Sequence, residues 1–455
     1  MSYSAVILAA GKGVRMRSEL PKVVHKLSGK PIILHVVEAV YQAGVTDITI
    51  VVGHERDKVR EILADYPVNF AIQEKQLGTG HALMQARTEV NHNNTLLVLA
   101  GDIPLLQAET IKGLLQFHTQ KKNIATILST SLENPKGYGR IVRDNDAFLK
   151  IVEEKDATVE EKLIGEINSG IYCFQAANAF AALDKIDTEN AQGEYYLTDI
   201  LGILKKEGQK VDVLLTTASS DVFGINDRVQ LSQAQAIMYR RKNLALMKNG
   251  VTIIDPASTF VDNEVEIASD TVIMPFTIIT GKTKIGNNCE IGPYSHINDS
   301  LIGHEVVIEN SRIRQAEIGN KCLIGPFAYI RPESVLHENV KIGDFVEIKK
   351  SDIGADSKIP HLSYVGDAQV GENVNIGAGT ITCNYDGYNK HLTILEKGVF
   401  IGSNTNLVAP IKLGENAVTG AGSTISSDVP PNALVVERAT PKIIEDWATN
   451  KKKER

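Results

Sequence analysis

A glycine-rich string with two basic residues lies near the start of the chain and has the residue types that hold phosphate groups. It runs from Leu8-Ala9-Ala10-Gly11 through Arg15 and Met16, with Lys22 shortly after. Its glycines would let backbone N–H groups approach phosphate oxygens, and Arg15 and Lys22 would supply countercharge. The P-loop motif GxxxxGK[ST] is absent from this string. The motif GxGxxG is not matched either, because position 16 is methionine and not glycine. The string therefore indicates a phosphate-binding turn of another kind.

Two oxygen-bearing side chains occur where other apolar runs end. Asp102 follows the run 96–100 and Gly101, and Asn226 lies in Gly224-Ile225-Asn226. Oxygen ligands suit Mg²⁺, a hard ion that takes few protein ligands. A divalent ion and basic side chains would offset the repulsion between two reacting phosphates. On its own, Asp102 could equally be a strand-end cap or a turn residue.

A second set of residues with chemical potential lies far along the chain. Arg331 and Lys349 are separated by one turn of an 18-residue coil, so they could stack on one face. Two cations there would repel each other unless an anion such as a sugar phosphate lay between them, and a solvated basic patch is the alternative. His361 could be a neutral base near pH 7, although a lone histidine is more often structural.

The elements that would position the first set alternate between strands and helices. The apolar runs 5–9, 48–52 and 96–100 predict buried strands, and residues 32–43 have apolar side chains at helical spacing. This alternation predicts an α/β, Rossmann-like domain with a mostly parallel, doubly wound sheet. Ligands of such sheets bind at the carboxyl ends of the strands, where Gly11, Gly53 and Asp102 would lie.

A long helix is expected to separate this domain from the rest. Asn226-Asp227 offers an N-terminal cap, residues 228–248 carry apolar side chains at helical spacing, and Asn249-Gly250 is a C-terminal signal. We therefore predict a first domain over residues 1–227, a linker helix over 228–250 and a second domain over 251–455.

The second domain contains a pair of residues, an aliphatic residue followed by glycine, that recurs at intervals close to multiples of six. The pairs begin at Ile285, Ile291, Ile302, Ile318, Ile324, Ile342, Ile353, Val365, Val370, Ile376, Ile401 and Leu413. A six-residue period fits a parallel β-helix of three short strands per coil, with the aliphatic residue inside and the glycine relaxing the corner. Residues 382–391 break the period, and we expect them to project and to carry function.

The N-terminal string resembles the signature of sugar-phosphate nucleotidyltransferases. Gln73 with Leu77-Gly78-Thr79-Gly80-His81-Ala82 is similar to the base-recognition loop of these enzymes, and Gly101-Asp102 matches their metal-binding aspartate. The resemblance implies Mg²⁺ held by Asp102 and Asn226, with no side-chain nucleophile. It implies that nucleotide and sugar phosphate are bound by Leu8, Ala9, Ala10, Gly11, Arg15, Lys22, Gln73, Gly78, Thr79, Gly101, Asp102, Gly139, Glu153, Asn168 and Asn226.

His361 and the segment 375–387 closely resemble the acetyltransferase domain of the bifunctional N-acetylglucosamine-1-phosphate uridylyltransferase/glucosamine-1-phosphate acetyltransferase family. The resemblance covers nearly the entire chain. It implies a left-handed β-helix, a homotrimer, and His361 as the base that takes a proton from glucosamine 1-phosphate as its amine attacks acetyl-CoA. The product would react with UTP to give UDP-N-acetylglucosamine for the bacterial cell wall. The implied acceptor-binding residues are Arg331, Lys349, Tyr364, Asn375, Asn384, Tyr385 and Lys390, and those for acetyl-CoA are Ala378, Ser403, Ala421 and Arg438.

Composition limits the alternatives. The net charge of −7 argues against nucleic acid as the main partner. The four cysteines form no CxxC pair, and there is no long apolar run or signal-peptide pattern, so we expect a cytoplasmic enzyme with small-molecule substrates and no membrane span. A single-activity nucleotidyltransferase with a structural or regulatory β-helix is one alternative reading, and a non-enzymatic scaffold is another.

Overall fold

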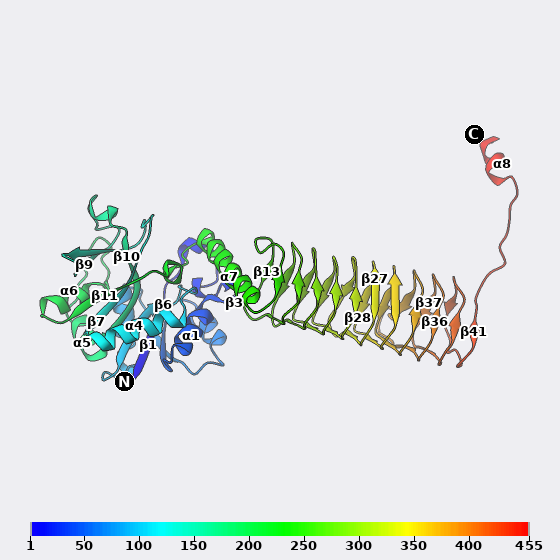
Figure 1. Ribbon diagram of the computed structural model, residues 1–455, viewed down its shortest axis with the longest axis horizontal. Helices are drawn as coiled ribbons and strands as arrows, with labels where there is room; N and C mark the ends of the chain where they lie inside the picture. The colour runs from blue at the N-terminus through cyan, green and yellow to red at the C-terminus, as the bar shows by residue number, and fades with distance from the viewer. Residues whose placement is uncertain (1, 454–455) are drawn as a thin grey trace. The chain divides into compact units, whose positions relative to one another are not determined.

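The computed structural model describes residues 2–453, which divide into two compact units after Met238 (Figure 1). The division falls inside the long helix α7 (Arg228–Lys248), in the region where the sequence predicts a linker helix over 228–250. Asp227 caps this helix, because its Oδ1 accepts a hydrogen bond from the Gln230 N–H at 2.8 Å. Gln230 in turn accepts a hydrogen bond from the Asn226 N–H at 2.7 Å, which fixes the chain just before the helix.

The first unit is built on a sheet with the strand order β11-β7-β10-β6-β1-β4-β5. Its strands are β1 (Tyr3–Leu8), β4 (Asp47–Val52), β5 (Asn69–Ile72), β6 (Thr95–Ala100), β7 (Ala125–Ser131), β10 (Glu166–Gln175) and β11 (Val211–Thr216), with β8 (Arg140–Asp144) and β9 (Ala147–Val152) at its side and β2 (Lys26–Leu27) and β3 (Lys30–Pro31) apart. The helices are α1 (Ile32–Gln42), α2 (Arg56–Ile62), α3 (Thr79–Gln85), α4 (Ala108–Lys121), α5 (Ala176–Leu183) and α6 (Asp199–Lys206), and the 3₁₀ turns are η1 (Val14–Met16), η2 (Lys22–Val24), η3 (Arg87–Glu89), η4 (Glu161–Leu163) and η5 (Ser219–Val222).

The mostly parallel sheet predicted from the apolar runs is confirmed, with β10 and the flanking strand β9 reversed. Strand β1 is parallel to β4 and to β6, whereas β10 is antiparallel to β6 and to β7. The chain reaches β10 through the β8–β9 hairpin rather than through a crossover helix, so it can return in the opposite direction. Because β1, β4 and β6 are parallel, their carboxyl ends meet at one edge of the sheet.

Both faces of the sheet are covered, which explains why most positions of its central strands β1, β4 and β6 are apolar. Ile7 and Leu97 pack on one side in the cluster that includes residues of α1 and α4. Val6 and Val98 pack on the other side with residues of α3, α5 and α6. Successive side chains of a strand point to opposite faces, so a strand with two covered faces favours apolar residues at successive positions.

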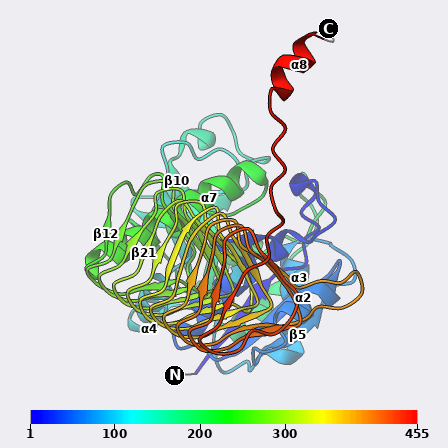
Figure 2. The same ribbon diagram turned by 90° about the vertical axis from the view of Figure 1, so that its right-hand side faces the viewer.

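The second unit is a left-handed parallel β-helix of three sheets over residues 252–435, seen end-on as a triangular stack in Figure 2. We call the sheets faces A, B and C. Face A contains β12 (Thr252–Ile253), β15 (Val272–Ile273), β18 (Glu290–Ile291), β21 (Val307–Ile308), β24 (Leu323–Ile324), β27 (Lys341–Asp344), β30 (Lys358–His361), β33 (Asn375–Ile376), β36 (Phe400–Ile401), β39 (Val418–Thr419) and β41 (Leu434–Val435).

Face B contains β13 (Phe260–Val261), β16 (Ile278–Thr280), β19 (His296–Asn298), β22 (Arg312–Arg314), β25 (Tyr329–Ile330), β28 (Glu347–Lys349), β31 (Tyr364–Gly366), β34 (Ile381–Cys383), β37 (Asn406–Val408) and β40 (Thr424–Ile425). Face C contains β14 (Glu266–Ile267), β17 (Lys284–Ile285), β20 (Leu301–Ile302), β23 (Glu317–Ile318), β26 (Val335–Leu336), β29 (Asp352–Ile353), β32 (Ala368–Val370), β35 (Thr393–Leu395) and β38 (Ile411–Leu413). Helix α8 (Trp447–Lys453) follows.

The aliphatic residue of each repeat is buried, as expected. Gly292 and Gly325 have positive φ angles, as predicted for a corner, whereas other repeat glycines have a different role. Ile342 and Ile353 are at most 1% exposed. Gly343 and Gly354 do not have positive φ angles, and a Cβ on Gly343 would lie 1.8 Å from the carbonyl oxygen of Pro360 in the next coil. These glycines are required because successive coils approach closely. The left-handed corner conformation is instead adopted by other residues, such as Phe345 with φ 57°.

Candidate active sites

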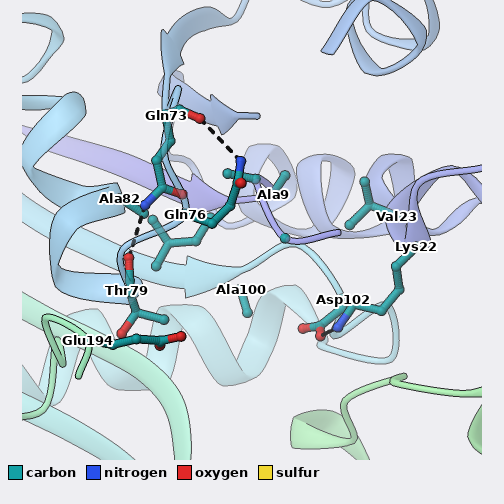
Figure 3. A pocket seen from close by; sticks show the side chains of 14 residues that line it. Ala9, Lys22, Val23, Gln73, Gln76, Thr79, Ala82, Ala100, Asp102 and Glu194 are labelled. Atoms are coloured by element: carbon teal, nitrogen blue, oxygen red, sulfur yellow. Dashed lines mark hydrogen bonds and ion pairs between the residues drawn. The ribbon is translucent and has the colours of Figure 1, made fainter. Parts of the chain in front are cut away.

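The first candidate site is a cavity of about 300 Å³ where β1 and β6 end. Figure 3 shows Lys22 and Asp102 at one end of it and Gln73 with Gln76 at the other. The cavity is lined by Leu8, Ala9, Ala10, Gly11, Lys22, Val23, Gln73, Gln76, Gly78, Thr79, Ala82, Ala100, Asp102 and Glu194. Nine of the residues expected from the sequence are among these, and both ends of the cavity carry polar groups.

The charged end of the cavity brings four predicted residues together. Lys22 Nζ contacts Asp102 Oδ2 and lies 3.1 Å from Asn226 Oδ1, and an Arg15 guanidinium nitrogen donates to the same Asn226 oxygen at 2.8 Å. The Ile225 N–H donates to the Asp102 carbonyl at 2.9 Å, so β6 and the segment before α7 hold Asp102 and Asn226 side by side. Two cations therefore converge on two oxygen ligands at the end of a parallel strand.

This arrangement fits a bound divalent cation. One oxygen of Asp102 and one of Asn226 are directed at the same point, which the Lys22 ammonium occupies. Two protein oxygens suit Mg²⁺, which keeps several waters and takes its other ligands from substrate phosphates. Within residues 2–453 no cluster of three or more His, Cys, Asp or Glu side chains could form a closed metal site. Asp102 and Asn226 would supply two oxygen ligands and leave the rest of the coordination sphere of such an ion open.

The other end of the cavity has a shape that only glycine allows. Gly78 has φ 109°, and a Cβ there would meet the Tyr195 backbone at 2.6 Å. Gln73 Nε2 donates to the Gly78 carbonyl at 3.1 Å, which leaves the amide oxygen of Gln73 as a free acceptor group near the cavity. Thr79 Oγ1 accepts the Leu197 N–H at 3.1 Å. A planar ring with donor and acceptor groups could enter here beside the glycine.

A third group, Gly139, Glu153 and Asn168, lies together but does not line the cavity. The Asn168 N–H donates to the Gly139 carbonyl at 2.9 Å, and a Cβ on Gly139 would lie 3.3 Å from the Glu153 carboxylate. Burial raises the pKa of Glu153, and the charges of Asp156 and Asp199 add to this effect, while a hydrogen bond from Thr198 opposes it. Thr198 follows Leu197, so Thr79 and Glu153 are connected through two consecutive residues.

The second candidate site lies on face B of the β-helix. Ile330 and Ile348 are register partners, so Arg331 and Lys349 occupy the same position in successive coils, as their spacing predicts. The anticipated repulsion is relieved within the chain, because Arg331 pairs with Glu347 and Lys349 with Asp367, each at 2.7 Å. Burial opposes ionisation of Asp367, but hydrogen bonds from Lys349 and Asn384 outweigh it and lower the pKa of this carboxyl.

The projecting segment brings polar groups to this cluster. Asn384 is buried, and its Nδ2 donates to the Tyr364 hydroxyl at 3.3 Å and to Asp367. Tyr385 and Lys390 form an antiparallel bridge, so the segment is an ordered hairpin and not an irregular loop. The neighbouring Lys349 ammonium lowers the pKa of Lys390. The cations at this site therefore outnumber the carboxylates Glu347 and Asp367 that pair with them. Tyr385 is 60% exposed and donates its hydroxyl to Gly387.

His361 lies at the corner where face A turns into face B, three residues before Tyr364. Its Nδ1 is 2.8 Å from Asp344 Oδ1, and the two residues are register partners. The hydrogen bond from His361 lowers the pKa of the Asp344 carboxyl. An ionised carboxylate at Nδ1 accepts that N–H and leaves the Nε2 lone pair free, which is the tautomer a general base requires.

The residues expected to bind acetyl-CoA continue along the same corner. Lys358 is paired with Asn375 in register, so His361 and Ala378, each three residues further on, occupy equivalent positions. The Ala378 carbonyl accepts the Asn404 N–H and the Ser403 carbonyl accepts the Gly422 N–H, which places Ala378, Ser403 and Ala421 in successive coils. Arg438 Nε donates to the Ala421 carbonyl at 3.2 Å. Asn375 lies on face A and is not hydrogen-bonded to the face B cluster within the described residues.

Several positions that the structure places at the candidate sites were not predicted. Asp344 could have been found, because it follows Ile342-Gly343 as His361 follows Ile359-Pro360. Gln76 is one residue before Leu77-Gly78 and could also have been noticed. Glu194 reaches the cavity from a loop more than 100 residues after the glycine that it faces, and the sequence carries no signal for it.

The fold and these two sites define a class of enzyme: a nucleotidyltransferase domain joined to a hexapeptide-repeat acyltransferase domain. Family models agree with this division. A model described as "MobA-like NTP transferase domain" matches residues 5–163, one described as "GMPPB C-terminal domain" matches 256–344, and one described as "Hexapeptide repeat of succinyl-transferase" matches 393–427.

Relatives similar over nearly the full chain are named "Bifunctional protein GlmU". The protein of Syntrophomonas wolfei is 61% identical over 97% of this chain and 99% of its own length. The protein of Carboxydothermus hydrogenoformans is 54% identical over the same shares, and that of Heliobacterium modesticaldum is 53% identical over 99% of this chain and 98% of its own. The chain belongs to the family of bifunctional GlmU proteins. It is a bifunctional enzyme with nucleotidyltransferase and acetyltransferase domains.

Proposed function

We propose that the chain acetylates glucosamine 1-phosphate with acetyl-CoA and then transfers UMP from UTP to the product, giving UDP-N-acetylglucosamine and pyrophosphate for cell-wall precursors. The observation that carries this proposal is the presence of two separate cation clusters in two different units. One lies beside an oxygen ligand pair at a strand end, and the other lies beside a histidine–aspartate pair.

In the nucleotidyltransferase domain, the sugar phosphate oxygen attacks the α-phosphate of UTP, and pyrophosphate leaves. Asp102 and Asn226 would hold Mg²⁺, which when bound neutralises charge on the phosphates. Arg15 and Lys22, which meet at the Asn226 oxygen, would turn to the phosphates and stabilise charge that grows on pyrophosphate. Gln73 would pair with the uracil edge beside Gly78, and Gly139, Glu153 and Asn168 would bind the sugar.

In the acetyltransferase domain, the cations of face B would bind the sugar phosphate next to the corner that carries His361. Arg331, Lys349 and Lys390 supply the positive charge. His361 Nε2 takes a proton from the amine as the nitrogen attacks the thioester carbonyl, the C–S bond breaks, and the proton passes to the leaving sulfur of CoA. Asp344 would accept the hydrogen bond from Nδ1 and orient the imidazole so that Nε2 can accept the proton. Acetyl-CoA would lie along the Ala378, Ser403 and Ala421 column.

The proposed enzyme is a cytoplasmic homotrimer assembled through its β-helix. Large apolar side chains line the corner between faces A and B with positive φ angles, and each is more than half exposed: Phe276, Tyr294, Phe327, Phe345 and Leu362. Such a column is costly on a monomer. Sedimentation analysis should give three times 49.6 kDa. A monomer at micromolar concentration would contradict the trimer.

No helix within residues 2–453 is long and apolar enough to cross a membrane.

The proposed reaction is tested by supplying glucosamine 1-phosphate, acetyl-CoA, UTP and Mg²⁺ to the purified protein. UDP-N-acetylglucosamine should form, with one CoA and one pyrophosphate released per molecule. Turnover only when N-acetylglucosamine 1-phosphate is supplied directly would support the single-activity alternative.

A further inference from the structure

Arg331 and Lys349 of the proposed acceptor site lie one above the other on face B, and a third cation continues this row in the preceding coil. Strand β22 (Arg312–Arg314) pairs with β25, with Ile313 opposite Ile330. Ile330 is itself opposite Ile348. The residues that follow these isoleucines, Arg314, Arg331 and Lys349, therefore occupy one position in three successive coils. Neighbouring strands are about 4.8 Å apart, so the three cations form a continuous column.

Tyr329 connects the extra coil to the acceptor site. The Arg312 guanidinium carbon lies 5.8 Å from the centre of the Tyr329 ring, and that of Arg331 lies 5.9 Å from the same centre. One aromatic ring is thus shared by an arginine of the acceptor site and an arginine outside it. Contacts of this kind orient guanidinium groups without neutralising them.

The two outer arginines differ from the inner cations in their partners. Arg331 and Lys349 each pair with a carboxylate. Among residues 2–453, no carboxylate forms an ion pair with Arg312 or Arg314, although the two lie on one strand with their side chains on the same face. Their charge affects His296, the register partner of Arg312. Burial lowers the pKa of His296, and the two guanidinium charges lower it further. Ion pairing within the described part of the chain therefore does not explain why Arg312 and Arg314 lie together on this face.

We propose that Arg312 and Arg314 form a guiding subsite that attracts the phosphate monoester acceptor and passes it to Arg331 and Lys349. This inference rests on the proposed acetyl transfer. The five cations of the face, counted with Lys390, and the carboxylates of Glu347 and Asp367 give a formal charge of +3. Without the two outer arginines it is +1, so the attraction of a dianion from a distance falls, whereas the groups around the reacting amine are unchanged.

The test is the dependence of acetyl transfer on salt in the R312Q/R314Q double variant, at saturating acetyl-CoA. At an ionic strength of about 20 mM, kcat/KM for glucosamine 1-phosphate should fall at least about threefold while kcat is unchanged. At about 1 M salt the variant and the wild type should agree, because charges are then screened within about 3 Å. The R312K/R314K variant, which retains both charges, should behave like the wild type.

The matched control is K282Q/K284Q, which removes the same net charge from a segment leading into face C. Its kcat/KM should equal that of the wild type. An equal loss in the control, an unchanged kcat/KM in R312Q/R314Q at low salt, a loss that persists at 1 M salt, or a lowered kcat would each overturn the guiding subsite. Absence of acetyl transfer in the wild type would instead refute the proposed function.

Discussion

His361 and Asp344 are register partners on adjacent coils, and 2.8 Å separates His361 Nδ1 from Asp344 Oδ1. The repeat itself creates this pair, because equivalent positions of successive coils are stacked. A second histidine–aspartate pair, His337 Nε2 with Asp352 Oδ1 at 2.8 Å, links the end of β26 to β29 on face C, although Asp352 is the register partner of Val335 and not of His337. The two pairs differ in their surroundings, since only the first lies at the corner beside the face B cations. We therefore propose that position beside the face B cations, and not the histidine–aspartate pair alone, distinguishes His361 as the general base.

The role of Asp344 can be measured with Asp344→Asn. The amide can no longer act as an ionised acceptor for Nδ1–H, so we expect kcat for acetyl transfer to fall roughly 10²-fold with little change in KM. Asp352→Asn is the matched control and should leave acetyl transfer unchanged. Equal kcat values for the two variants would show that Asp344 does not position His361.

Asp102→Asn should raise the Mg²⁺ concentration needed for half-maximal uridylyl transfer at least about 10-fold, because a neutral amide is a weaker ligand for a hard cation. Uridylyl transfer is measured from N-acetylglucosamine 1-phosphate and UTP over a Mg²⁺ series. Asp47→Asn serves as a control, since its carboxylate accepts a hydrogen bond from Ser4 at the opposite end of β4. An unaltered Mg²⁺ dependence in Asp102→Asn would remove this residue from the metal site.

Glu153→Gln tests the cost of burying a carboxylate. The pKa of Glu153 is raised in the folded protein, so the unfolded state ionises first as pH rises, and stability falls from about pH 4 upward. Glutamine removes this cost and keeps an acceptor for Thr198. At pH 8 we expect the variant to have a higher Tm than the wild type, by about 2–4 °C for each 1 kcal/mol gained in the free energy of unfolding. Near pH 3.5 the two proteins should have the same Tm. A lower Tm at pH 8 would contradict the account.

The close approach of successive coils predicts a large effect of Gly343→Ala. The added Cβ would lie 1.8 Å from the Pro360 carbonyl oxygen, so the coils must separate, at a cost of about 1–3 kcal/mol. Gly113→Ala is the contrasting control, because Gly113 lies inside α4 with nothing within 4 Å of its Cβ, and it should stabilise by about 0.5–1 kcal/mol. Calorimetric melting of both variants decides this, and equal melting temperatures would show that the coils can move apart freely.

The sequence was sufficient to predict features that follow from a repeat or from a local run. The period of the Ile-Gly pairs predicted the coil, and it also placed Arg331 above Lys349. It did not reveal why the glycines are there, because the restriction at Gly343 comes from an atom in the next coil. It did not predict the reversal of β10, which the chain reaches from the neighbouring strand β7 through the β8–β9 hairpin. The contact of Gly78 with the Tyr195 backbone likewise depends on tertiary packing.

We propose that one chain holds two independent sites for anionic substrates, and the most direct test assays each half-reaction in two variants. His361→Ala should lose acetyl transfer and keep uridylyl transfer at the wild-type rate, and Asp102→Ala should show the reverse. Equal amounts of the two variants, mixed, should then make UDP-N-acetylglucosamine from glucosamine 1-phosphate. Loss of both half-reactions in either correctly folded variant would contradict the claim.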